Sequence, residues 1–275
     1  MKTWLIPLFA AISLALTAPV GAVSLSEDIL NRLKSADVVL LGEVHDNPAH
    51  HQVQADLVAQ IVPKALVFEM LTPQQATRAT PDLIQDRAAL DAALGWAESG
   101  WPDFMMYHPI FLAAPQARVF GAAVPRDAAR AAMQTGIAES FGAQATQYGL
   151  TEPLQQSEQQ RREALQMEAH CDALPAHLLP AMVDIQRLRD ARLAQEAVRA
   201  LEETGGPVAV ITGNGHARAD WGVPRFLRRV DADVTVFALG QSEEGGALRG
   251  DFDAVIDGPG VERPDPCAAF ATSGG

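Results

Sequence analysis

The sequence predicts an α/β fold in which a mostly parallel β-sheet is flanked by helices and carries a helical subdomain inserted between its third and fourth strands. Six short runs rich in Val, Ala, Leu and Phe are typical of strands that are buried on both faces. Helical stretches separate the first three runs, and strand–helix–strand order is the signature of a parallel sheet with crossover helices. The six predicted strands cover residues 37–42, 65–69, 118–124, 207–213, 234–239 and 253–256.

The crossovers between the first three strands are predicted to be helical. Apolar residues recur at helical spacing over residues 48–62, and a second helical stretch covers residues 83–99. Asp46 or Asn47 can cap the first helix, and Pro48 suits its first position.

The helical subdomain is predicted over residues 128–203, which contain no strand pattern and are rich in Ala, Gln, Glu, Arg and Leu. We expect this insertion to cover one end of the sheet. The Gly- and Pro-rich tail over residues 257–275 is expected to be irregular.

The amino-terminal 22 residues have the pattern of a signal peptide. Lys2 precedes an apolar run over residues 5–16, which Pro19 and Gly21 interrupt before a small-residue ending. We place cleavage after Ala22, so that residues 23–275 form the mature domain, exported to an oxidising compartment such as the periplasm. The alternative, an uncleaved membrane anchor, is less favoured because of the proline, the glycine and the small residues.

The cysteine content and the net charge of the chain indicate its compartment and exclude some kinds of partner. In an exported chain, Cys171 and Cys267 are expected to form a disulfide, with two unrelated thiols as the alternative. No CxxCH sequence is present, which excludes covalent attachment of a c-type haem. The formal net charge of −13 argues against a nucleic-acid partner, because phosphate binding requires a basic face.

Unusual polar residues fall at the carboxyl ends of four predicted strands. Two of these strands run into Gly-x-x-His turns, Gly42–His45 and Gly213–His216. In a parallel sheet the carboxyl ends of the strands form the edge at which ligands bind. The candidate catalytic residues at this edge are Glu43, His45, Glu69, Arg126, His216 and Arg218.

Each of these residues also has a structural interpretation. Glu43 can cap a helix, and His45 can satisfy a backbone carbonyl. Glu69 ends an apolar strand, so its carboxylate needs a partner, which we expect to be Arg126 or Arg218. The glycines of the two turns are expected to supply permissive dihedral angles.

The same edge could bind a divalent metal ion. Histidine nitrogens and carboxylate oxygens are common ligands, although the spacing is not that of a HExxH helix. Either Glu43 or Glu69 would then be the general base of a metal-assisted hydrolase. The candidate metal ligands are His45, His216, Glu43, Glu69 and His50.

One helical face of the insertion carries three polar groups. Gln186, Arg189 and Asp190 fall at positions i, i+3 and i+4 of a helix that begins near Ala181. This face either closes over the cleft or faces solvent.

Several segments resemble the ChaN-like proteins, which are described as haem-binding uptake proteins of the Tiki/TraB/erythromycin-esterase superfamily. The resemblance extends over nearly the whole mature chain in the expected order. One departure is Ala123, where the family usually places Asn, and this costs the cleft a hydrogen-bond donor. The segments are LLGEVHDNPAHHQVQ (40–54), FEM (68–70), SGWPDFMMYHPIF (99–111), AAVPR (122–126), HCDALPAHLLPAMVDIQRLRDARLA (170–194), ITGNGHARADWGVPRFL (211–227) and DPCAAF (265–270).

The resemblance implies an α/β fold, export, and haem binding linked to iron acquisition. It also implies a homodimer around the haem and outer-membrane or periplasmic uptake components as partners. Haem iron takes Tyr, His, Met or Cys ligands, and the candidate ligands are Tyr148 and Tyr107. His170 and His177 are further candidates for the haem site, as partners of the haem carboxylates or as surface residues. Of the two tyrosines, Tyr148 is expected on an exposed or intersubunit surface.

The wider superfamily includes metal-dependent proteases and other hydrolases, so a metal-dependent hydrolase is the alternative function. A scaffold that has lost its activity is the third.

Overall fold

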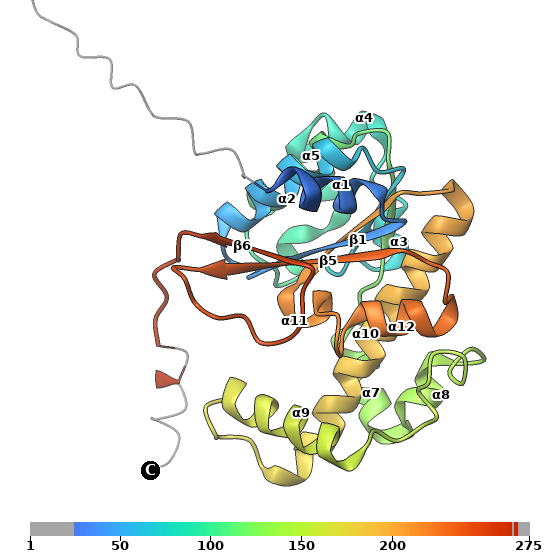
Figure 1. Ribbon diagram of the computed structural model, residues 1–275, viewed down its shortest axis with the longest axis vertical. Helices are drawn as coiled ribbons and strands as arrows, with labels where there is room; N and C mark the ends of the chain where they lie inside the picture. The colour runs from blue at the N-terminus through green and yellow to red at the C-terminus, as the bar shows by residue number, and fades with distance from the viewer. Residues whose placement is uncertain (1–24, 266, 269–275) are drawn as a thin grey trace, which may run out of the picture.

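The computed structural model describes residues 25–265, 267 and 268 (Figure 1). The predicted signal peptide over residues 1–22, with its cleavage site after Ala22, lies outside these residues. Within them, no helix has both the length and the apolar character that crossing a membrane requires.

The core of the molecule is a six-stranded sheet in which every strand pair is parallel. The predicted α/β class is therefore confirmed, and all six predicted strands form. Their order across the sheet is β3-β2-β4-β1-β5-β6. The strands are β1 (Val38–Glu43), β2 (Ala65–Phe68), β3 (Arg118–Gly121), β4 (Val208–Gly213), β5 (Val236–Glu243) and β6 (Ala254–Gly258).

Two strands end three or four residues away from their predicted ends, and the other four end within two residues of them. β3 ends at Gly121 because the amide of Ala123 donates to the carbonyl of Leu71 instead of continuing the ladder. β5 continues to Glu243 because its polar second half pairs with β6, and Ser242 donates a hydrogen bond to Asp257 at 2.7 Å. A strand that turns polar gives no apolar run to recognise.

Helices cover both faces of the sheet, because successive apolar side chains of β1 point to opposite faces and both sets are buried. Val39 and Leu41 pack into the core on one face, and Val38 and Leu40 pack into the core on the other. The helices on the first face are α1 (Glu27–Ser35), α2 (Pro48–Ile61), α3 (Pro73–Ala76), α4 (Pro81–Ile84), α5 (Arg87–Leu94), the 3-10 helix η1 (Trp96–Glu98) and α6 (Phe104–Ala113).

The predicted helix starts follow from the capping residues. Asn47 caps α2 through a hydrogen bond that its side chain accepts from the amide of Ala49, and Pro48 occupies the first position. The stretch predicted over residues 83–99 is broken instead of continuous. Asp86 caps a new helix there, and Gly95 ends it in the left-handed conformation at φ 61°.

The second face and the helical subdomain are built mostly by the predicted insertion. It begins at Arg126 and ends at Thr204, close to the predicted limits of 128 and 203. Figure 1 shows α10 running from beside the sheet down to the helices that project below it. The elements are α7 (Arg126–Thr135), α8 (Ile137–Phe141), α9 (Gln156–Ala169), the 3-10 helix η2 (Ala176–Leu178) and α10 (Leu179–Thr204), followed after β4 by α11 (Asn214–Ala217) and α12 (Val223–Val230).

The predicted disulfide forms between Cys171 and Cys267. It joins the turn after α9 to the carboxyl-terminal tail, which is irregular after β6 over the residues described. Next to it, Glu168 of α9 pairs with Arg249 of the loop between β5 and β6 at 2.5 Å. Together with the ion pair of Arg225 with Glu158, these two links connect α9 to the rest of the molecule.

Candidate functional site

The two Gly-x-x-His turns lie side by side at the carboxyl edge of the sheet. β1 and β4 are neighbours, with Glu43 opposite Gly213 in the register. The chain leaves β1 into α2 on one face of the sheet and leaves β4 into α11 and α12 on the other. Such a divergence opens a crevice at the strand ends of a parallel sheet.

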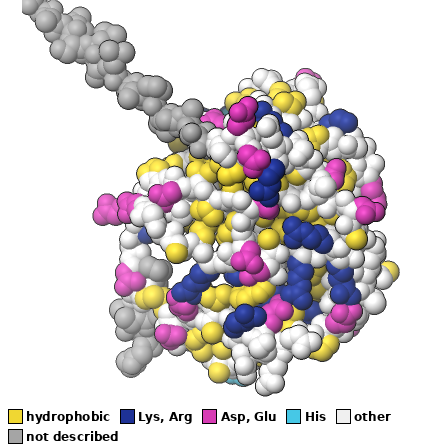
Figure 2. All heavy atoms as spheres, viewed as in Figure 1, with side chains coloured by type: hydrophobic (Ala, Val, Ile, Leu, Met, Phe, Trp, Pro, Cys, Tyr) yellow, Lys and Arg dark blue, Asp and Glu magenta, His cyan; other side chains and the backbone are white. Residues whose placement is uncertain are grey.

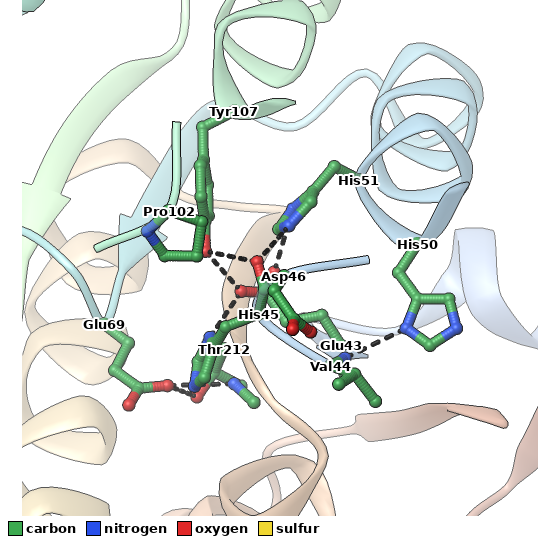
Figure 3. Close-up of polar contacts among 12 residues, drawn as sticks. Glu43, Val44, His45, Asp46, His50, His51, Glu69, Pro102, Tyr107 and Thr212 are labelled. Atoms are coloured by element: carbon green, nitrogen blue, oxygen red, sulfur yellow. Dashed lines mark hydrogen bonds and ion pairs between the residues drawn. The ribbon is translucent and has the colours of Figure 1, made fainter. Parts of the chain in front are cut away.

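Glu43 is the centre of a buried hydrogen-bonded cluster (Figure 3). Its Oε1 lies 2.7 Å from Nδ1 of His45 and accepts a 2.9 Å hydrogen bond from the Tyr107 hydroxyl. Its Oε2 accepts from the amide of Gln54 at 2.7 Å and lies 3.4 Å from Nδ1 of His51. Burial alone would raise the pKa of Glu43, but hydrogen bonds and charge from the two histidines lower it to about 2.

His45 presents one ring nitrogen to the cleft. With Nδ1 held by Glu43, Nε2 has no hydrogen-bond partner in the described part of the chain, and 34% of the side chain is exposed. The ring packs against Trp101, with the centroids 4.9 Å apart. Burial would lower the pKa of His45, but Glu43 and Glu69 raise it.

His216 lies between two carboxylates. Its Nδ1 is 2.7 Å from Asp190 of α10, and its Nε2 is 3.5 Å from Glu69 at the end of β2. Burial would lower the pKa of His216, but the two carboxylates raise it to about 9. The ring is therefore a buried cation at neutral pH.

The expected partners of Glu69 are wrong. Its Oε2 accepts hydrogen bonds from the Thr212 hydroxyl at 2.6 Å and from the amide of Gly213 at 2.9 Å. Arg218 instead pairs with Asp220 through two hydrogen bonds of 2.6 and 2.7 Å. Glu69 therefore needs no arginine. The Thr212 hydroxyl, the Gly213 amide and the His216 ring, all from β4 and the turn after it, satisfy its buried carboxylate.

Arg126 is exposed at the start of α7 and forms no ion pair with a described residue. A Cβ placed on Gly100 would lie 3.9 Å from its Nη2, so the guanidinium lies beside that loop. It faces the cleft without contacting Glu69.

The two turns need glycine because there is no room for a side chain, and not because of an unusual backbone conformation. Gly213 has an ordinary extended conformation, with φ −65° and ψ 152°, and Gly42 does not have a positive φ. A Cβ on Gly213 would lie 2.9 Å from Nε2 of His45, and one on Gly42 would lie 2.5 Å from Oδ1 of Asn214. The expectation of permissive dihedrals is wrong, and close approach between the two turns is the reason for glycine.

The cleft consists of two adjoining cavities that share His45, Gln186 and His216. The first, of about 590 Å³, has Leu165, Val183, Trp221 and Leu248 among its walls, and we call it the apolar cavity. The second has a volume of about 540 Å³, and we call it the polar cavity because Glu69, Arg126 and Arg189 lie on its wall. Both volumes are in the range of small-molecule sites. Figure 2 shows hydrophobic side chains in a hollow of the lower half, with basic and acidic side chains around it. The polar cavity is lined by Glu69, Trp101, Arg126 and Arg189 in addition to the shared residues.

The polar face predicted on the insertion closes over the cleft. Gln186 lines both cavities, Arg189 lines the polar cavity, and Asp190 lines the apolar cavity and bonds His216. Ala123, the departure from the family pattern, also lines the polar cavity.

The two tyrosines lie away from both cavities. Tyr148 was expected on an exposed or intersubunit surface, but it is 2% exposed and packs against Phe141 with the ring centroids 5.0 Å apart. Burial raises its pKa to about 12. Tyr107 is fully buried, and burial together with the charge of Glu43 raises its pKa strongly.

The remaining predicted histidines are separate from the site. His50 is turned away from His45 (Figure 3), because its Nδ1 accepts a 2.9 Å hydrogen bond from the amide of Val44, and burial lowers its pKa. His170 ends α9, and its Nδ1 donates to the carbonyl of Gln166 at 2.7 Å. His177 is exposed on η2.

The predicted metal set does not assemble. Over residues 25–265, 267 and 268, no group of three or more His, Cys, Asp or Glu side chains could hold a metal ion. Hydrogen bonds explain why: Glu43 is enclosed by its donors, His50 points elsewhere, and both nitrogens of His216 face carboxylates.

Several residues of the site have no role in the sequence analysis, among them two tryptophans, a threonine and an arginine. Trp101, Thr212 and Trp221 lie within segments that carry the family resemblance, but the sequence alone assigns them no role. Arg162 and Trp221 line the apolar cavity and stack on each other, with the guanidinium carbon 4.9 Å from the ring centroid. They are 59 residues apart in sequence, and their pairing follows only from the fold.

Comparison with known proteins gives a consistent assignment. The family model described as haem-binding uptake, Tiki superfamily, ChaN matches residues 29–227. A solved structure described as cofacial heme binding to ChaN of Campylobacter jejuni is similar in fold, with a TM-score of 0.63 and 21% identity over 84% of this chain and 90% of that one. The type III effector HopBA1 matches with a TM-score of 0.44 and 13% identity, covering 84% and 91%. No curated protein sequence matches.

Proposed function

Because the chain belongs to the haem-binding uptake family of the Tiki superfamily that includes ChaN, we propose that it binds haem in the apolar cavity. One observation carries this proposal: the cavity joins apolar walls to basic residues and to a histidine with a free nitrogen. Haem is a flat apolar ring with an iron centre and two carboxylates, so it requires these three features together.

The walls of the apolar cavity fit the ring and its carboxylates. Trp221 and Leu248 offer apolar surface, and Arg162, Arg218 and Arg249 lie on the same lining. Each of these arginines is already paired, with Glu158, Asp220 and Glu168 respectively. A haem carboxylate would therefore share or exchange a partner at the edge of the cavity.

His45 is the residue we propose as the iron ligand. Its Nδ1 donates to Glu43, which fixes the tautomer that leaves Nε2 free, and a carboxylate behind a ligating histidine increases its basicity. Iron held there would supply the binding energy that fixes haem in the cleft. The tyrosine alternatives are weaker, because burial raises the pKa of both phenols and a tyrosine binds iron as the phenolate.

The test is a titration of the purified protein with haem, followed by its Soret absorption. We expect His45→Ala to weaken binding by at least tenfold and to shift the band, whereas His177→Ala, Tyr148→Phe and Tyr107→Phe keep the wild-type spectrum. Loss of the band in either tyrosine variant would place the ligand there instead. Absence of any band in the wild type would end the haem proposal.

Export and self-association extend the same proposal. The Cys171–Cys267 disulfide supports an oxidising compartment such as the periplasm. We also propose that two chains associate around haem and pass it to uptake components, in line with the cofacial haem described for the Campylobacter jejuni protein. Light scattering with and without haem tests the first part, and a mass that stays monomeric with haem bound contradicts it.

A second candidate function is hydrolysis in the polar cavity. The observation that favours it is the His45–Glu43 pair, in which an oriented imidazole leaves Nε2 to act as a general base. Turnover of activated esters that survives chelators and is lost in Glu43→Gln would support it. No turnover above that of Glu43→Gln would remove it and leave the haem proposal unaffected.

A further inference from the structure

Two arginines that line the polar cavity have no partner among the residues that the structure describes. Arg126 at the start of α7 and Arg189 of α10 both contribute to its wall. Neither forms a hydrogen bond or an ion pair with another described side chain, whereas the arginines of the apolar cavity are all paired. Two unpaired guanidinium groups on one cavity wall leave positive charge directed at its interior.

The backbone adds to this charge. α7 has ten residues and no side-chain hydrogen bond at its amino-terminal end, where Pro125 precedes the first turn. Pro125 and Arg126 both line the polar cavity, so the uncapped amides of this turn begin at its wall. The exposed Asp127 of the same turn pairs loosely with Arg130, at 3.6 Å.

The carboxylate already in the cavity does not cancel the charge of the arginines. Glu69 is satisfied by Thr212, by the amide of Gly213 and by His216, whose pKa is about 9. Arg189 lies close enough to His216 for its charge to oppose protonation of that ring. With Glu69 beside His216, the two arginines leave positive charge on the wall of the polar cavity, in a chain whose formal net charge is −13.

We propose that the polar cavity binds a small organic carboxylate, beside the haem cavity with which it shares His45, Gln186 and His216. Arginine guanidinium groups match a carboxylate through paired, charge-assisted hydrogen bonds. Gln186, whose side chain has no hydrogen bond to any described residue, lies where the two cavities meet and offers an amide for a second polar group of the ligand. The ligand class is therefore a short dicarboxylate or hydroxycarboxylate that the cavity of about 540 Å³ accommodates.

The test is isothermal titration calorimetry of the full, haem-free chain with succinate, at constant ionic strength. Succinamide is the matched neutral probe, because it keeps the length and loses both charges. We expect succinate to bind and succinamide not to bind. Arg126→Gln and Arg189→Gln should each weaken succinate by about tenfold, the size of one charge-assisted hydrogen bond.

Arg130→Gln is the control variant, since Arg130 lies on α7 one turn after Arg126 and is not on the cavity wall. It should bind succinate as the wild type does. No heat with succinate, equal binding of succinamide, or an equal loss in Arg130→Gln would each overturn the proposal. Tighter binding of inorganic phosphate than of succinate would overturn the carboxylate class. Because haem is absent, each of these outcomes leaves the haem proposal to its own test.

Discussion

Nδ1 of His45 lies 2.7 Å from Oε1 of Glu43, two residues earlier at the end of the same strand. The histidine therefore has its orientation fixed by a carboxylate that the sheet itself holds in place. The same oxygen accepts the Tyr107 hydroxyl from α6, so a helix on one face of the sheet supports a residue that faces the cleft.

Removing the Tyr107 hydroxyl should cost stability but leave the cleft intact. In Tyr107→Phe the buried carboxylate loses one of its donors, and we expect the free energy of unfolding to fall by about 1–2 kcal/mol. Urea denaturation measures this, and haem titration should give the wild-type affinity. A stability equal to the wild type would mean that the hydrogen bond contributes nothing.

Gly213→Ala should damage the site through steric overlap alone. The added Cβ would lie 2.9 Å from Nε2 of His45, so the imidazole must move away from the position proposed for ligation. We expect haem affinity to fall by about tenfold, with a loss of about 1–3 kcal/mol in folding stability.

The matched control is Gly215→Ala, two residues later, where an added Cβ meets nothing within 4 Å. Gly215 lines the same cavity but lies away from His45, so this variant should lose less haem affinity than Gly213→Ala. Equal losses in the two variants would mean that the turn tolerates no alanine and that the contact with His45 is irrelevant.

The folding stability of the haem-free protein should fall as the pH rises from 6.5 to 9. In the folded chain the pKa of His216 is raised to about 9, from the ordinary histidine value of 6.5. Below 6.5 both states are protonated and the contribution is fully present. Between the two values only the folded state keeps the proton, so the contribution is lost progressively, in total on the order of 3 kcal/mol.

Urea unfolding at pH 6, 7.5 and 9 measures this dependence, and His216→Gln is the comparison. The variant should be less stable than the wild type at pH 6 and should show a flatter profile. An unchanged slope in His216→Gln would assign the pH dependence to other groups.

Removing the disulfide should destabilise the chain and loosen the projecting helices. Cys171 and Cys267 are 96 residues apart, and a crosslink over a loop of that size contributes about 4–5 kcal/mol in the chain-entropy model. The double variant Cys171→Ser/Cys267→Ser should melt at a lower temperature, and hydrogen exchange should rise first in α9. A melting temperature equal to that of the oxidised wild type would contradict this.

The sheet could be predicted from the sequence because its strands are buried on both faces and read as continuous apolar runs. The limit is visible in β5, whose polar half pairs with β6 through Gln241 and Ser242 and gives no such run. The candidate site followed from the parallel topology, which brings Glu43, Glu69 and His216 to one edge.

The hydrogen-bond partners of these side chains could not be predicted from the sequence. Glu69 was expected to need an arginine, and its partners are a hydroxyl, an amide and a histidine, which depend on the register of β2 against β4. Tyr148 was expected at a surface because it lies beside Gly149 in the insertion and belongs to no repeating pattern of apolar residues. Its burial depends on the packing of α8 against the rest of the subdomain.

The helix α10 has a consequence for the way ligands enter. Over its second half a row of alanines, Ala191, Ala194, Ala197 and Ala200, is fully buried and lets the helix lie close to the sheet. The same unbroken helix carries Gln186, Arg189 and Asp190 into the cleft. A hinge motion of α10 that widened the cleft would have to separate these alanines from the sheet. The packing of α10 on the sheet therefore fixes the width of the cleft. The other wall of the apolar cavity is α9, and we expect its position, held by the Cys171–Cys267 disulfide and by the ion pair of Glu168 with Arg249, to limit the entry of ligands.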